Sequence, residues 1–224
     1  MTSTLKVREN VLAFGNHCAR VSVKCGLQII LEVFAEFNRV TSRNLEADFF
    51  EALDEHTPCF IQLFKSKKGS VGQKLTELMQ SINWVTPDVT EQRSVVLKGI
   101  AIVLGNDSND FFKTCFDTTR DEALSSVTVG VLTVLSEDSP QEGPSSMQLE
   151  PISISIVLEG GIVMEEIQNF PQAVCLLFGL IYALHFDYPK CMANTLRFVQ
   201  TVMLGLGTKT LSPKLLTVRN ALLE

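Results

Sequence analysis

The chain has 224 residues, 46% of them hydrophobic, and a formal net charge of −6 at pH 7. This composition supports a substantial core and excludes a chain that is mostly disordered. The negative charge argues against a nucleic-acid-binding protein, because nonspecific affinity for phosphate needs clustered lysine and arginine. The basic cluster Lys65, Lys67 and Lys68 is typical of a solvated loop after a helix.

Six cysteines are scattered along the sequence without the spacing of a disulfide framework, and the N-terminus lacks the pattern of a secretory signal. We therefore expect an intracellular protein, cytoplasmic or nuclear, with free and mostly buried thiols. His17, Cys18 and Cys25 come nearest to a metal-binding cluster, but their spacing does not match a zinc site. No metal and no cofactor are expected.

The first half of the sequence predicts helices. Residues 1–32 form the least readable segment, although a helical pattern begins near Leu27 and continues to Val40. Further helices are predicted from Leu45 through a kink at Pro58 to Phe64, over residues 69–82, and from Glu91 to Gly105. Residues 33–224 are expected to form a single α+β domain.

Three strands are predicted next, at residues 127–135, 152–158 and 162–166, because β-branched residues alternate there and Gly160-Gly161 suits a tight hairpin. We expect them to form a small antiparallel sheet that packs against a buried C-terminal helix. The segment between the first two strands, residues 136–151, is rich in Ser, Pro, Glu and Gly, and predicts a mobile loop.

The C-terminal helices have clear boundaries. Asn169 can cap a helix that Pro171 begins, and residues 173–186 are apolar on nearly every side. A second, amphipathic helix is predicted from Pro189 to the glycines at 205 and 207, and a short closing helix after Ser212-Pro213. The apolar helix falls short of the roughly 20 residues that span a bilayer, so burial in protein is expected. Membrane association through residues 170–186 remains an alternative.

Two further functional hypotheses follow from side-chain chemistry. The chain could be a cysteine- or histidine-dependent enzyme centred on Cys175, His185 and Cys191, although the sequence alone does not bring these groups together. No phosphate-binding glycine loop is present. The hypothesis that we favour is a protein-interaction module with no enzymatic activity.

Two adjacent pairs of aromatic residues are the candidate partner-binding groups: Phe49-Phe50 and Phe111-Phe112. Neighbouring residues on a helix or strand point in different directions, so one ring of each pair should be less buried than the other. The less buried rings would contact a protein partner.

Several segments carry a resemblance to a known group of proteins. They are residues 33–58, 69–75, 104–118, 129–135 and, as the most specific, 169–207 (NFPQAVCLLFGLIYALHFDYPKCMANTLRFVQTVMLGLG). They resemble the C-terminal region of uncharacterised vertebrate proteins, some of which are named as similar to sterile alpha motif domain-containing protein three. In that group a sterile alpha motif commonly precedes this region, but residues 1–32 do not match one, so oligomerisation through that motif is not expected. The resemblance implies no activity and no functional residues.

Overall fold

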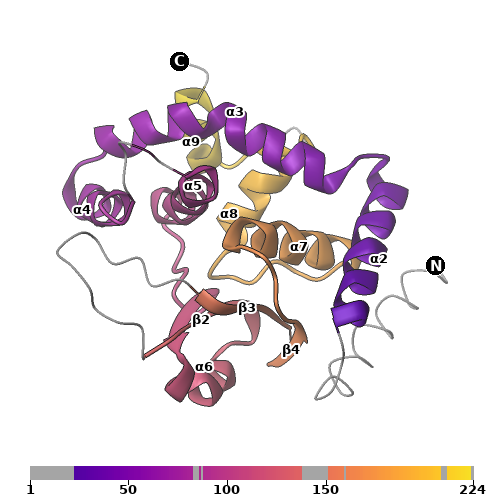
Figure 1. Cartoon of the computed structure of the whole chain (residues 1–224). Coiled ribbons are helices and arrows are strands. Elements are labelled where there is room, and N and C mark those ends of the chain that lie inside the picture. The colour runs from indigo at the N-terminus through magenta and orange to yellow at the C-terminus, as the bar shows by residue number, and fades with distance from the viewer. Residues whose placement is uncertain are drawn as a thin grey trace. The chain divides into compact units, whose positions relative to one another are not determined.

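The structure is a computed structural model that describes residues 23–82, 86, 88–137, 151–158, 160–207 and 211–222, without the side chains of residues 23–28. Its described part is α+β, with eight helices and a four-stranded mixed sheet (Figure 1). The chain folds into two compact units. The first comprises Met1–Glu46, Asn109–Gly143 and Leu149–Asp187, and the second Ala47–Ser108, Pro144–Gln148 and Tyr188–Glu224.

The first unit contains the sheet, whose strand order is β1-β2-β3-β4. Its strands are β1 (Phe112–Phe116), β2 (Val129–Leu135), β3 (Pro151–Leu158) and β4 (Gly161–Met164). β1 runs parallel to β2, and the other pairs are antiparallel. A crossover through a 3-10 turn (Asp117–Thr119) and helix α6 (Arg120–Ser126) connects the two parallel strands, which a tight hairpin could not do.

The three predicted strands are present as β2, β3 and β4, and they pair antiparallel as predicted. The sequence-based prediction missed the fourth strand, β1, whose parallel pairing with β2 makes the sheet mixed. β1 escaped prediction because it is only five residues long and neither of its faces is uniformly polar or apolar. The third predicted strand also ends earlier, at Met164 rather than residue 166. Glu166 adopts a left-handed backbone conformation (φ 56°), which interrupts the extended chain.

The predicted loop at 136–151 lies mostly outside the described residues. Ser136 and Glu137 follow β2, and Pro151 already belongs to β3. The single domain over residues 33–224 stays a prediction, as does the mobility of the loop. In residues 1–32, the structure describes the main chain from Val23, where helix α2 (Val23–Thr41) begins.

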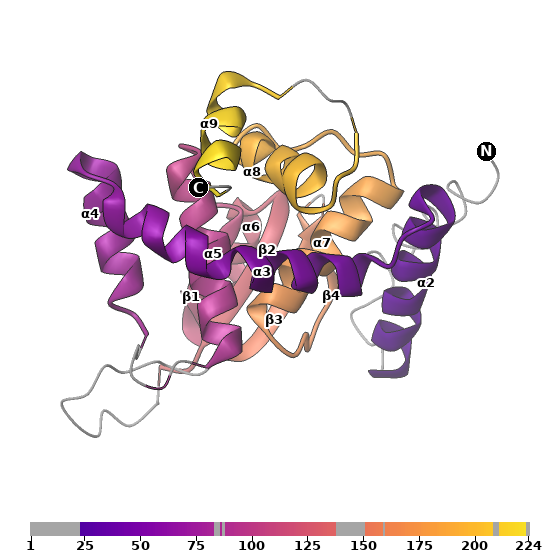
Figure 2. The same ribbon diagram turned by 90° about the horizontal axis from the view of Figure 1, so that it is seen from above.

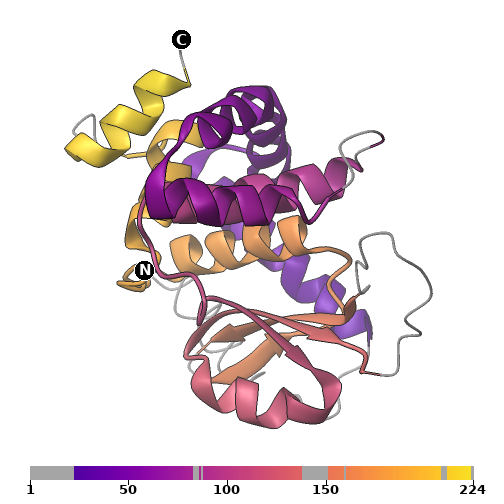
Figure 3. The same ribbon diagram turned by 90° about the vertical axis from the view of Figure 1, so that its left-hand side faces the viewer.

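The two faces of the sheet are covered by different helices (Figure 3). On one face, α6 packs against alternate residues of the central strands. The buried members of this cluster are Ala123, Val127, Leu132, Val134 and Val157, with Cys115, Leu124 and Ile162 at its margin. The opposite face carries helix α7 (Phe170–Ala183).

Helix α7 is the buried C-terminal helix that the sequence predicts. All its residues are buried except Gln172 and Tyr182, which are half-buried. Asn169 caps it as expected, since its side chain accepts a hydrogen bond from the N–H of Gln172 at 2.9 Å. A helix apolar on all sides needs protein on all sides; within this unit the sheet contacts one flank and α2 another.

The contact between α2 and α7 is close and aromatic. The Phe37 ring lies 5.2 Å from the Tyr182 ring and 6.3 Å from the Phe178 ring, centroid to centroid. Gly179 allows this approach, because a Cβ atom there would lie 2.9 Å from Val33 Cγ1 of α2.

The second unit is helical. It contains most of α3 (Leu45–Ser66), α4 (Gly69–Met79), α5 (Val89–Val103), α8 (Ala193–Phe198), a π-helical turn (Val199–Met203) and α9 (Pro213–Ala221). Helices α4 and α5 lie side by side, and Figure 1 views both along their axes. Phe60 of α3 and Phe198 of α8 are fully buried, with ring centroids 6.0 Å apart. α3 continues through Pro58, as predicted.

Local signals at the helix ends of this unit are mostly confirmed. Ser212 caps α9, and Gly205 and Gly207 follow the π-helical turn with positive φ. The amphipathic helix, however, begins at Ala193 and not at Pro189. Asn106 fixes this start, because its Oδ1 accepts hydrogen bonds from Thr195 N (3.0 Å) and Thr195 Oγ1 (2.9 Å).

Candidate interaction site

The two aromatic pairs show the predicted asymmetry. Phe49 and Phe111 are 0% and 1% exposed, whereas Phe50 and Phe112 are half-buried. In each pair the rings meet edge to face, with centroids 5.5 Å apart for the first and 5.2 Å for the second. Phe49 and Phe111 are therefore core residues, and only Phe50 and Phe112 remain candidates for partner contact.

Phe50 lies on α3 beneath an arginine from α5. The guanidinium carbon of Arg93 stands 4.5 Å from the Phe50 ring centroid, a cation–π geometry. Arg93 also donates two hydrogen bonds to Asp54, from Nε to Oδ1 (2.8 Å) and from a terminal nitrogen to Oδ2 (2.6 Å). These bonds raise the pKa of Arg93. This pair of hydrogen bonds holds the guanidinium over the Phe50 ring, so the immediate surroundings of the ring are fixed.

The same face of α5 carries an exposed apolar side chain. Val89, one turn before Arg93, is 53% exposed. We call Phe50, Asp54, Val89 and Arg93 the Phe50 surface; Figure 2 shows α3 and α5, which provide it. Aromatic side chains, phenylalanine among them, and arginine are enriched in the cores of protein interfaces relative to the rest of the surface.

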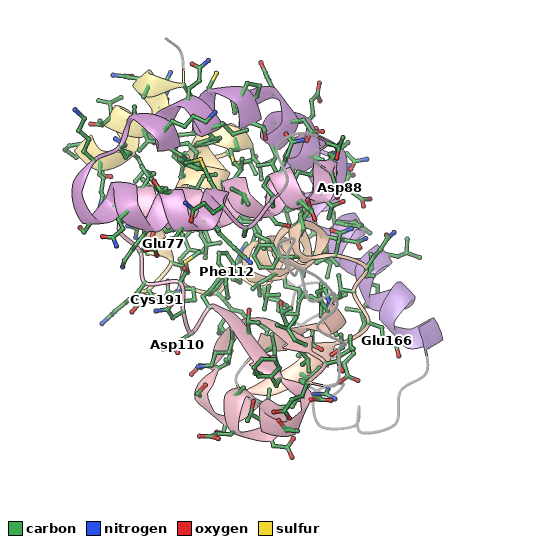
Figure 4. The ribbon with its side chains drawn as sticks, turned by 60° about the vertical axis from the view of Figure 1, so that its left-hand side comes forward. Glu77, Asp88, Asp110, Phe112, Glu166 and Cys191 are labelled. Carbon is green, nitrogen blue, oxygen red and sulfur yellow. The ribbon has the colours of Figure 1, made fainter. Side chains whose placement is uncertain are left out.

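Phe112 has a different setting. Besides Phe111, its ring meets the Phe170 ring of α7 edge to face, with centroids 5.0 Å apart. Figure 4 labels it at the start of β1, close after Asp110. Phe112 thus helps to join the sheet to α7, and less of its ring is available to a partner than its position on an edge strand suggests.

The sequence alone did not predict which residues contact or neighbour these rings. Arg93 and Asp54 are 39 positions apart, and no local pattern connects them. Phe116, at the end of β1, is 43% exposed. Its place after the Phe111-Phe112 pair was visible in the sequence, but its exposure on an edge strand was not.

The thiol and imidazole of the enzyme hypothesis do not converge within the first unit. Cys175 and His185 are ten positions apart along α7 and its C-terminus, which corresponds to about 15 Å of helical rise. Cys175 is 1% exposed, and burial raises the pKa of its thiol, with a smaller contribution from the charge of Glu46. A buried neutral thiol is a poor nucleophile.

His185 is a helix-end residue. It has a positive φ of 54°, and its backbone N–H donates to the carbonyl of Tyr182 at 3.2 Å. Its Nδ1 lies 3.1 Å from the same oxygen. His185 therefore terminates α7, as its place in the sequence indicates.

Among the described residues, no group of three or more His, Cys, Asp or Glu side chains could hold a metal ion. His17 and Cys18, which with Cys25 come nearest to a metal-binding cluster in the sequence, lie outside them, as does the side chain of Cys25. A shallow cavity of 390 Å³ lies between residues 151–154 and 166–168 of the first unit. None of the helices in the described residues combines the length and the apolar character that a membrane span requires.

The fold and these surfaces define an α+β protein with exposed aromatic and edge-strand features. No protein-family model, no curated protein and no solved structure matches it. The resemblance to proteins similar to sterile alpha motif domain-containing protein three therefore stays a prediction.

Proposed function

We propose that this chain is a non-enzymatic protein-interaction module, active inside cells, that binds a protein partner through the Phe50 surface. The observation that carries the proposal is the half-buried Phe50 ring, over which stands the guanidinium of Arg93, itself held by two hydrogen bonds to Asp54. A ring whose setting is fixed before binding loses little conformational entropy when a partner covers it.

The chemistry of this surface suggests the kind of partner. Phe50 and Val89 offer apolar area, and the charged pair at its rim offers hydrogen bonds. We expect a protein that inserts an apolar side chain against the Phe50 ring and places a polar group near Asp54. The free thiols of Cys59, Cys115 and Cys175 support an intracellular location.

Proximity labelling of the full chain in cells tests the proposal, followed by pull-down of the labelled proteins. Phe50→Ala should remove a central contact and weaken binding by about 2 kcal/mol or more, roughly thirtyfold in affinity. Leu216→Ala is the matched control, because Leu216 is a 42% exposed apolar residue of the same unit, outside the Phe50 surface. It should leave the partners bound.

Thermal melts of each variant separate lost binding from lost folding. If Phe50→Ala together with Phe112→Ala leaves every pull-down partner bound, the assignment of partner binding to these aromatic residues is wrong.

A further inference from the structure

The two edges of the sheet differ in how they are protected. Figure 2 labels β1 on one side of the sheet and β4 on the other. The β4 edge is irregular: its pairing with β3 shifts register, and the strand ends at Met164, before Glu165 and the left-handed Glu166. Bulges and charges are devices that prevent strand addition. All five residues of β1, in contrast, pair in uninterrupted register with β2, and β1 contains no proline.

The main-chain groups on the outer side of β1 can be assigned. The N–H of Val131 in β2 donates to the carbonyl of Phe111 at 2.7 Å. Because main-chain groups alternate in direction along a strand, Lys113 and Cys115 also face β2, whereas Phe112, Thr114 and Phe116 direct theirs outward. In the described structure no strand pairs with this side, and Thr114 at its centre is exposed.

The sequence of β1 is suited to pairing with itself. If two copies meet antiparallel with Thr114 opposite Thr114, then Phe112 lies opposite Phe116 of the second copy, and all outward main-chain groups of these residues exchange hydrogen bonds. The side chains of Phe112, Thr114 and Phe116 share the sheet face that carries α7. The exposed Phe116 ring would therefore cover the half-buried Phe112 ring of the other copy.

The charges on β1 also permit this arrangement. Lys113 would lie directly opposite Cys115 of the second copy, a neutral residue, and its diagonal neighbours would be the exposed Asp117 and Lys113 of that copy. No like charges lie directly opposite each other, and Asp117 offsets the diagonal pair of lysines. Lys113 is the one charged residue in β1, and it is already held near Asp110 (3.7 Å).

We propose that this protein forms a homodimer in which the β1 strands of two copies pair antiparallel about Thr114 to make one continuous sheet. The inference is independent of the Phe50 surface, which belongs to the other unit. A two-fold axis through Thr114 makes the contact self-complementary and closed, as in most soluble dimers.

Sedimentation of the full chain over a range of concentrations tests the dimer. Thr114→Pro removes an outward N–H that the contact with β2 does not use, and proline is tolerated at such edge positions. It should weaken dimerisation by about tenfold or more, and so should Phe116→Asp, which places a carboxylate against an aromatic ring. Thr114→Val keeps the main chain unchanged and should retain the dimer.

A disulfide test reports the register. In the proposed pairing Lys113→Cys brings a thiol opposite the native Cys115 of the other copy, at a Cα separation of about 4.5 Å, which suits a disulfide. Mild oxidation should give a covalent dimer, whereas Lys113→Cys combined with Cys115→Ser should not.

Two results would overturn the proposal. One is a chain that stays monomeric up to about 100 µM, which would leave the edge to a strand of a different protein. The other is a dimer that does not form through the β1 edge. It would be shown if the Thr114→Pro and Phe116→Asp variants both dimerise and melt as the native chain does, or if cross-linking persists without Cys115. Failure of either kind would not affect the Phe50 surface, whose test uses other variants.

Discussion

At the scale of single residues, two buried hydroxyl groups differ in their hydrogen bonding. Thr195 is 3% exposed, and its Oγ1 donates to Asn106. Ser155 is 0% exposed, and its hydroxyl has no hydrogen-bond partner among the described residues. Burial of a polar group without a partner lowers stability, whereas burial with a partner is close to neutral or favourable.

Replacing these two hydroxyls should therefore change stability in different directions. Ser155→Ala removes an unsatisfied group and should leave the free energy of unfolding unchanged or raise it by about 1 kcal/mol. Thr195→Val removes a satisfied group of similar size and should lower it by about 1 kcal/mol. Urea unfolding followed by circular dichroism measures both. If Ser155→Ala is as destabilising as Thr195→Val, the hydroxyl of Ser155 has a partner after all.

At the scale of elements, α5 illustrates how an N-terminal cap gives a helix a pH dependence. Asp88 accepts hydrogen bonds from the N–H groups of Thr90 (2.8 Å) and Glu91 (3.1 Å). The bond from Glu91 contributes most to lowering the pKa of Asp88 below its ordinary value of 3.8. The charged carboxylate is thus the better cap, and it also interacts favourably with the helix dipole.

The sign of the pH effect follows from this lowered pKa. The stabilisation by Asp88 is fully present above the unfolded-state pKa and is lost as the pH falls through the lower folded-state pKa. Asp88→Asn keeps a capping oxygen but does not titrate. The native chain should therefore have the higher melting temperature at pH 7, and the difference should shrink as the pH is lowered from about 5 to about 3. Parallel curves for the two proteins would contradict the role of the charged cap.

Edge strand β1 shows the limit of pattern-based prediction at this scale. Its five residues owe their strand conformation to pairing with β2, and each pairs with a residue 19 positions further along the sequence. Local periodicity cannot reveal such a contact, since a short strand with two partly covered faces shows no regular alternation of polar and apolar residues. The long apolar helix and the hairpin were predictable because their patterns are local.

At the scale of the whole molecule, the proposed dimer makes a prediction about amide hydrogen exchange. In β1 the N–H groups of Lys113 and Cys115 face β2, and those of Phe112, Thr114 and Phe116 face outward. In dilute solution, protection should therefore alternate along the strand. As the concentration rises and dimers form, the outward amides should become protected as well.

Nuclear magnetic resonance at several protein concentrations measures this exchange residue by residue. The amides of β4 serve as the internal comparison, because this irregular edge should not change with concentration. Protection of Thr114 that is independent of concentration, with no dimer present, would show that the chain itself covers the edge.

The sequence by itself determined the α+β class, the buried helix with its Asn169 cap, the Ser212 cap and the unequal burial of the two rings in each aromatic pair. These features depend on hydrogen bonds within one helical turn and on apolar periodicity, both of which are written in neighbouring residues. Only the tertiary structure decided that β1 lies parallel to β2 at the edge of the described sheet, and that Arg93 covers Phe50. Both depend on contacts between segments that are distant in the sequence. Such contacts form only when the chain folds, so no local sequence pattern predicts them.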